Sequence, residues 1–226
     1  MSPTPLAKRA VAEALGTALL VAVVVGSGIM AEDHAGGNVA LALLANTLAT
    51  GAGLVALILT FGPISGAHMN PAVTLAMTSQ RQLAWRDAPV YIIAQIAGAF
   101  AGVMLAHVMF GRALFAASRH VRSTPGELVG EVVATFGLLS VIWGVARRRP
   151  TAMPYAVGAY ITAAYWFTSS TSFSNPAVTL ARAATDTFAG IRPADAPAFI
   201  VAQLIGAFAA TAVFAWLVPA RTPERS

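Results

Sequence analysis

The 226-residue sequence contains no cysteine and few charged residues. Without cysteine, disulfides and metal sites built on thiolates are excluded. Only 10% of the residues are Asp, Glu, Lys or Arg, against roughly 25% in an ordinary soluble domain. A soluble chain of this length would need more charged surface to cover several apolar helices. The composition therefore favours a membrane protein.

Three long stretches, 34–80, 150–181 and 196–220, contain no Asp, Glu, Lys or Arg. Each exceeds the roughly 20 apolar residues that cross a bilayer as a helix. The first apolar run resembles a signal peptide because it follows Lys8 and Arg9, but it is long and contains Glu13, so we interpret it as a membrane span. Apolar runs between turn residues predict six transmembrane helices, over 10–30, 38–61, 88–109, 127–146, 152–168 and 196–218.

Two shorter segments, 70–79 and 175–185, each begin with Asn-Pro-Ala: Asn70, Pro71 and Ala72, then Asn175, Pro176 and Ala177. Asparagine as a cap, followed by proline, is a favourable helix start. A helix of about ten residues is about 15 Å long, half the hydrocarbon thickness. Such half-helices need protein or a water-filled cavity around their ends. They indicate a conduction path, although buried turns with only a packing role are the alternative.

An internal repeat relates the two ends of the chain. The seven residues from Asn70 recur unchanged from Asn175, Glu13 corresponds to Glu131, and 94–100 resembles 202–208. Three spans per half is an odd number, so the second half enters the membrane from the opposite side. We therefore predict an all-α membrane protein with six transmembrane helices and two re-entrant half-helices. It forms one domain, 1–226, of inverted halves at about 5–110 and 123–219.

Basic residues predict the orientation. If both termini are cytoplasmic, nine of the 14 Lys and Arg residues lie inside: Lys8, Arg9, Arg81, Arg86, Arg147, Arg148, Arg149, Arg221 and Arg225. The positive-inside rule favours this topology in the cell's inner membrane. The outer loop with Arg112, Arg119 and Arg122 departs from the rule, and the sequence alone does not explain it. The net charge of +5 sets orientation, and no motif indicates nucleic-acid binding.

With its doubled motif, the chain resembles the aquaporin or major intrinsic protein family over essentially its whole length, most typically at 65–74. The resemblance implies a homotetramer in membrane lipid, with one pore per subunit for water or small uncharged solutes. Half-helices that meet near the midplane would each present about half a positive charge, and these charges would oppose cations and protons. Asn70 and Asn175 would each donate an amide N–H to a passing oxygen.

Residues around the two motifs complete the expected pore. Gly66, Ala67 and His68, with Thr171, Ser172 and Phe173, are predicted to present carbonyl oxygens to it. Buried glutamates are functional suspects in membranes, and Glu13 and Glu131 could serve proton coupling. The resemblance favours another role, in which they accept hydrogen bonds from the re-entrant loops. His68 could gate with pH, but as part of the common motif it is expected to pack.

The sequence departs from the family at the selectivity filter. Typical members carry an arginine directly after the second Asn-Pro-Ala, where this chain has Val178. Counting from the two asparagines predicts Thr50, Ala163 and Ser172 as the other filter residues, although the position given to Ala163 could shift, since Tyr165, Trp166 and Phe167 lie close by. Arg182, one turn further along, is expected outside the filter. The filter should be wider and less polar than usual.

A valine filter resembles the bacterial aquaporins associated with arsenic resistance, which implies passage of neutral arsenite, As(OH)3, besides water and polyols. An ordinary water channel and a glycerol facilitator are the alternatives within the channel class. A secondary transporter is a more remote one, because apart from the two glutamates the spans offer no charge for coupling. We expect no cofactor, no metal and no enzymatic activity.

Overall fold

The computed structural model describes residues 4–217, and over that range it consists of helices and loops without a strand. The helices in chain order are α1 (Leu6–His34), α2 (Val39–Ser65), α3 (Pro71–Ser79), α4 (Ala88–Met109), α5 (Pro125–Ala146), the 3-10 turn η1 (Pro150–Ala152), α6 (Met153–Phe167), α7 (Pro176–Arg182) and α8 (Ala196–Leu217). The all-α prediction with two short helices is confirmed. Arg221, Arg225 and the predicted bounds at 218 and 219 lie outside the described residues.

Five of the helices, α1, α2, α4, α5 and α8, are long and apolar enough to cross a membrane. The sixth, α6, has only 15 residues, which corresponds to about 22 Å at 1.5 Å per residue. The predicted span over 152–168 is therefore shorter than expected. The 3-10 turn precedes it because Pro150 and Pro154 have no backbone N–H to donate to an earlier helical turn.

Close crossings hold each half of the bundle together. Helix α1 packs against α2 and α4, α5 packs against α6 and α8, and the two halves meet where α2 contacts α6. A methyl group on Gly98 would overlap the carbonyl oxygen of Ala14 on α1, and one on Gly206 would overlap that of Val132 on α5. Because glycine has no Cβ, the α1–α4 and α5–α8 backbones can touch at these equivalent points.

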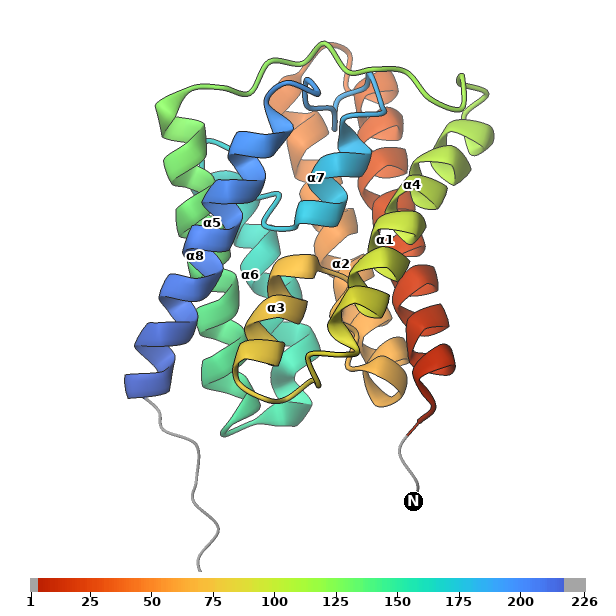
Figure 1. Cartoon of the computed structure of the whole chain (residues 1–226). Coiled ribbons are helices and arrows are strands. Elements are labelled where there is room, and N and C mark those ends of the chain that lie inside the picture. The colour runs from red at the N-terminus through yellow and green to blue at the C-terminus, as the bar shows by residue number, and fades with distance from the viewer. Residues whose placement is uncertain (1–3, 218–226) are drawn as a thin grey trace, which may run out of the picture.

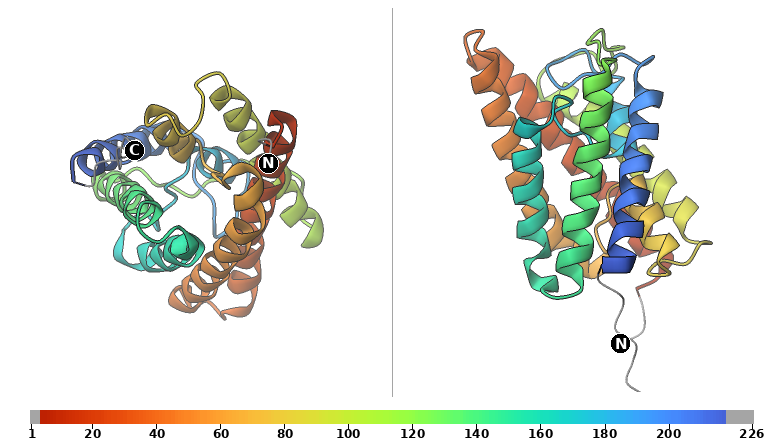
Figure 2. Two further views of the ribbon diagram at one scale, coloured as in Figure 1. Left: turned by 90° about the horizontal axis from the view of Figure 1, so that it is seen from below. Right: turned by 90° about the vertical axis from the view of Figure 1, so that its left-hand side faces the viewer.

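The short helices α3 and α7 occupy opposite ends of the bundle (Figure 1). We call the end where α1 begins and α8 ends the lower end; the upper end carries the connecting segments 110–124 and 183–195. Seen from below, the six longer helices form a ring, and the segments that lead into α3 and α7 run through its middle (Figure 2). Helix α3 contacts α4 and α8, and so does α7. This arrangement places both Asn-Pro-Ala motifs inside the ring.

Candidate pore

The two asparagines cap their helices and also join them. Asn70 Oδ1 accepts hydrogen bonds from two backbone N–H groups of α3 at 2.9 and 3.4 Å, and Asn175 Oδ1 does the same in α7 at 3.1 and 3.3 Å. Asn70 Nδ2 donates to the carbonyl oxygen of Ser174, and Asn175 Nδ2 donates to that of Met69, each at 2.7 Å. Each amide has a second N–H, and both asparagines line the central cavity.

Glu13, fully buried on α1, holds the loop before α3. Its carboxylate accepts hydrogen bonds from the backbone N–H groups of His68 at 2.9 Å and Met69 at 2.6 Å, and from the side chains of Ser65 at 2.6 Å and Gln95 at 2.7 Å. A buried carboxylate is tolerable only with such partners. The geometry is that of a loop-holding group rather than of a free proton acceptor.

Glu131, fully buried on α5, repeats this pattern in the second half. It accepts hydrogen bonds from the backbone N–H groups of Phe173 at 2.8 Å and Ser174 at 2.9 Å, and from Gln203 Nε2 at 2.6 Å. The two backbone donors stand one and two residues before the asparagine, as in the first half. The consequence of losing either carboxylate stays a prediction, although the hydrogen bonds match the expected role.

Both loops adopt an uncommon backbone conformation at matching positions. Ala67 and Met69 have φ angles of 48° and 47°, and their counterparts Ser172 and Ser174 have 51° and 48°. Residues with a Cβ rarely adopt positive φ, and each costs on the order of 1–3 kcal/mol unless the surroundings enforce it. The glutamates enforce this conformation by accepting hydrogen bonds from the backbone N–H groups of His68 and Met69 in the first loop and of Phe173 and Ser174 in the second.

One cavity of about 160 Å³ passes both asparagines and reaches from Met77 and Met153 near the lower end to Arg182 near the upper end. Its walls include most of the predicted pore residues: Thr50, Gly66, Ala67, His68, Asn70, Ser172, Phe173, Asn175 and Val178. The other motif residues, Pro71, Ala72, Pro176 and Ala177, are buried but are not part of its wall. Thr171 is not part of the wall, and Ser174 lines it instead.

Ala163 does not face the cavity, so that filter prediction is wrong. Helix α6 lines the cavity with Val157, Ile161 and Tyr165, which are four residues apart and share one helix face. Ala163 lies midway between the last two and is exposed on the outside of the bundle. The Tyr165 hydroxyl lies 3.3 Å from Thr50 Oγ1. The wall at this level is therefore narrower and more polar than a wall with alanine.

Arg182, expected outside the filter, lines the same cavity as Val178. It is only 2% exposed, its guanidinium carbon lies 3.3 Å from the centre of the Phe173 ring, and its Nε donates to the carbonyl oxygen of Ala189. Counting from the asparagines does place Arg182 on the same helix face as Val178. That spacing was the available signal for including it in the pore.

The three arginines of the upper segment 110–124 fasten it to its neighbours. Arg112 pairs with Asp33 at 3.1 Å, and Arg119 pairs with Asp186 at 2.9 Å. Arg122 is buried, and its guanidinium donates to carbonyl oxygens within segments 168–174 and 183–195 at 3.4 and 3.0 Å. The role of this basic loop could not be predicted from the sequence, because the partners of its arginines lie far away along the chain.

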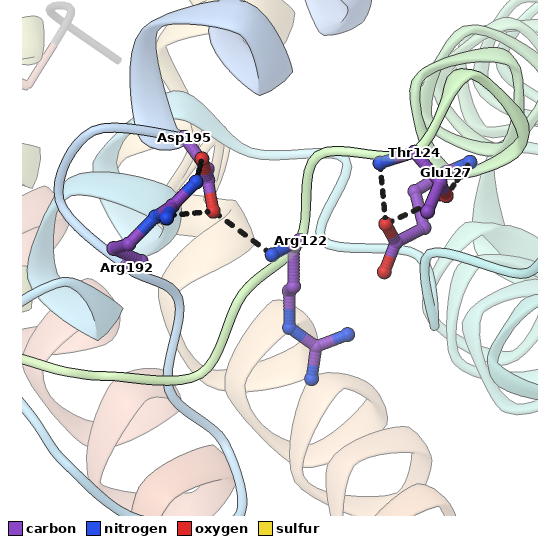
Figure 3. A network of polar contacts seen from close by, with 5 residues as sticks. All are labelled: Arg122, Thr124, Glu127, Arg192 and Asp195. Atoms are coloured by element: carbon purple, nitrogen blue, oxygen red, sulfur yellow. Dashed lines mark hydrogen bonds and ion pairs between the residues drawn. The ribbon is translucent and has the colours of Figure 1, made fainter.

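Asp195 links Arg122 to the segment before α8 (Figure 3). Its carboxylate accepts a hydrogen bond from the backbone N–H of Arg122 at 2.9 Å and pairs with Arg192 at 2.6 Å. The Arg192 guanidinium holds the pKa of Asp195 below its usual value. Beyond Arg122, Thr124 and Glu127 form a capping box that starts α5.

His120 lies in the same segment, 110–124, at the upper end of the bundle. Burial lowers the pKa of its imidazole, and the positive charges of Arg122 and Arg182 lower it further. Glu127 and Asp186 oppose that shift. The imidazole is therefore affected by the charge of the cavity-lining Arg182.

Comparison with known proteins identifies the family. The family model described as Major intrinsic protein matches residues 1–170 and 150–225. The chain belongs to the major intrinsic protein family. Members of this family are channels, so the protein is a transmembrane channel and not an enzyme.

Individual members of the family resemble this chain over different lengths. Aquaglyceroporin AqpS of Rhizobium meliloti (strain 1021) is 55% identical over 222 residues, which cover 98% of this chain and 95% of the relative. Aquaporin NIP2-2 of Zea mays is 34% identical over 84% of this chain and 66% of its own length. The crystal structure of the aquaglyceroporin from Plasmodium falciparum has a TM-score of 0.73 and 23% identity, and the match covers 95% of this chain and 98% of that one. That structural likeness supports the aquaporin-like fold.

Proposed function

We propose that this channel passively conducts small uncharged solutes through a filter without the usual arginine: water, glycerol-like solutes and neutral arsenite. The observation that carries the proposal is Val178, which stands in the cavity wall where the resemblance expects a guanidinium. The hydroxyls of Thr50, Tyr165 and Ser172 line the same cavity. Hydroxyls can donate and accept hydrogen bonds, while the isopropyl group contacts the apolar side of a polyol. As(OH)3 presents the same kind of hydroxyl surface.

The similarity to a protein called an aquaglyceroporin, at 55% identity over nearly the whole chain, supports the glycerol part of the proposal. The second candidate is an ordinary water channel. Tyr165 favours it, because a phenol ring near Thr50 leaves less room than the alanine expected from the sequence. A coupled transporter finds less support, because Glu13 and Glu131 are both committed to loop hydrogen bonds.

We further propose that the channel is a homotetramer in the inner membrane with both termini in the cytoplasm. The start of α1 and the end of α8 lie together at the lower end (Figure 1), as does the basic connection 147–149 between α5 and α6. The positive-inside rule makes that end cytoplasmic. The proposal of a tetramer follows from the family resemblance, and apolar exposed side chains such as Leu48 and Ile93 suit lipid or a neighbouring subunit.

The test compares water, glycerol and arsenite permeability of liposomes containing the wild type, Val178→Arg or Ala163→Val. Stopped-flow light scattering measures the first two, and arsenic uptake measures the third. Val178→Arg should retain water flux and reduce glycerol and arsenite flux about tenfold or more, because a guanidinium fills and charges the cavity. Ala163→Val, outside the cavity, should change none of the three.

If the wild type conducts only water and Val178→Arg behaves like it, the wide-filter proposal fails and the water channel stands. If the wild type conducts glycerol but not arsenite, the channel is a glycerol facilitator. Arsenite accumulation against its gradient would instead indicate a transporter.

A further inference from the structure

Residue Arg182 distinguishes the two ends of a cavity that is otherwise built by repetition. The identical heptapeptides end at Ala76 and Ala181, and the next residues are Met77 and Arg182. Both of these residues line the cavity. The inverted repeat therefore places a thioether near the lower end and a guanidinium at the equivalent point near the upper end.

We propose that Arg182 is the channel's cation-rejecting residue, a fixed positive charge at the upper end of the cavity that replaces the charge missing at Val178. The inference rests on the proposed function, because it takes this cavity as the conduction path. Arg182 would determine which ions the channel excludes, whereas Val178 and its neighbours would determine which uncharged solutes it conducts.

The charge of Arg182 is directed at the cavity. Its Nε donates to Ala189, but neither Nη atom donates a hydrogen bond to another described residue, and neither is sealed from solvent. The Phe173 ring lies against the guanidinium and fixes its plane. Since the side chain is nearly fully buried and lines the cavity, its remaining donors point into the path.

The nearby charges do not cancel that of Arg182. Within residues 4–217, none of the ion pairs includes Arg182. Asp186 and Asp195 pair with Arg119 and Arg192 instead. A unit charge a few Å from the path acts strongly on an ion that has lost part of its hydration.

The buried Arg122 supplements Arg182. Its guanidinium carbon lies 5.1 Å from the centre of the Phe173 ring, which Arg182 also contacts. Glu131, on α5, is the carboxylate that accepts hydrogen bonds from the backbone N–H groups of Phe173 and Ser174. Both guanidinium groups lie against the Phe173 ring, whereas the Glu131 carboxylate contacts this segment through its backbone N–H groups. The amino end of α7 adds its partial positive charge lower in the cavity.

This positive end also differs from a conventional arginine filter. At Val178 a guanidinium would narrow the path beside Thr50 and Ser172, whereas Arg182 lies one helical turn nearer the mouth. The placement leaves the hydroxyl-lined stretch at Thr50 and Ser172 free of a guanidinium, while an entering ion still meets a positive charge. The channel can thus reject cations without excluding polyols by size.

The test measures potassium and proton leak beside glycerol flux in liposomes containing the wild type, Arg182→Gln, Arg182→Lys or Arg182→Met. Arg182→Gln removes the charge but can still donate to Ala189, and Arg182→Lys keeps the charge without the planar fork. Arg182→Gln and Arg182→Met should raise the cation leak about tenfold or more. Arg182→Lys should remain tight. Because Arg182 lines the cavity, the cation leak of each variant is compared with the glycerol flux of the same variant, which separates loss of charge from a change in the width of the path.

The inverted repeat offers a matched control at Met77. The double variant Arg182→Met with Met77→Arg moves the charge to the lower end and should restore rejection of cations. If Arg182→Gln leaks no more cation than the wild type while it still conducts glycerol, this inference is overturned and the proposed function stands. A wild type that conducts neither glycerol nor water would overturn the proposed function and this inference with it. Should Arg182→Met fail to fold, the pair Arg182→Gln and Arg182→Lys still decides the question.

Discussion

The two half-helices share seven residues and the same supporting bonds, yet they end differently. In both halves a fully buried glutamate accepts the two N–H groups before the asparagine, and a glutamine braces it. Beyond the repeat the lower wall contains Met77 and Ile58, while the upper wall contains Arg182 and Tyr165. The shared part holds the loops and the asparagines in place. The divergent part makes the lining of the path different at its two ends.

The surroundings of the halves differ in the same sense. The loop after α3 is short, whereas the residues after α7 are fastened by the segment 110–124 through Arg119 and Arg122. At the upper end three charged residues, Arg122, Asp195 and Arg192, are connected directly (Figure 3). Among the described residues, ion pairs involve Arg112, Arg119 and Arg192 at the upper end and Arg9 and Arg86 at the lower end, so charged side chains at the upper end have defined partners.

The largest expected effect comes from removing the shared part. Glu13→Gln and Glu131→Gln each turn an acceptor into an amide that cannot pair with every loop N–H. Each variant should lose about 2–4 kcal/mol of stability and most of its glycerol flux, because the positive-φ residues lose their restraint. Thermal unfolding in detergent and stopped-flow measure the two effects.

The exposed glutamate at the end of α1 provides the control. Glu32→Gln changes the same functional group outside the cavity and should leave the melting temperature and flux unchanged. Should Glu13→Gln and Glu131→Gln melt and conduct like Glu32→Gln, the loops would be held by packing alone, and the shared network would have no supporting role.

A smaller effect is expected from the divergent wall. Tyr165→Ala removes the phenol ring beside Thr50 and should increase glycerol flux roughly threefold or more, with a smaller change in water flux. Ala163→Trp, a larger change on the outer face of the same helix, should leave both fluxes unchanged. The opposite pattern, with flux responding to Ala163 alone, would place the path on the other face of α6.

The sequence predicted the shared part of the molecule more completely than the divergent part. The same seven residues follow from Asn70 and from Asn175, and each half has a glutamate at the matching place. Because these features occur twice, the sequence predicted both loops and the position of Val178 in the cavity wall. The predicted filter residue on α6 was Ala163, two positions before Tyr165. Counting back from Asn175 crosses the irregular segment 168–174, where Thr171, Ser172 and Ser174 have positive φ, so the helix face could not be predicted from spacing alone.

Arg182 and the basic upper loop show a different limit. The direction of the Arg182 side chain depends on the Phe173 ring and on the carbonyl oxygen of Ala189, which a curved loop brings back to α7. The partners of Arg119 and Arg122 lie more than 40 residues away. No local pattern predicts such pairings, because they arise only once the two halves have packed together.

The smallest expected effect tests the charge at the upper end without any flux measurement. The positive charges of Arg122 and Arg182 lower the pKa of His120, after the larger contribution of burial. Removing one of these cations favours the protonated imidazole, so Arg182→Gln should raise the pKa of His120 toward its usual value. Met77→Gln, at the equivalent position near the lower end, should leave that pKa unchanged. Glu127 and Asp186, which raise the pKa of His120, are present in both variants and do not account for a difference between them.

Nuclear magnetic resonance of histidine-labelled protein would follow this titration, with His120→Gln assigning the signal among the four histidines. A His120 pKa that responds to Arg182 and not to Met77 would show that the charge reaches the mouth of the path. A pKa unchanged in Arg182→Gln would mean that the guanidinium is screened from the upper end. The contrast between Met77 and Arg182 would then be one of shape alone, and cation rejection would have to come from the amino ends of α3 and α7, which the two halves share.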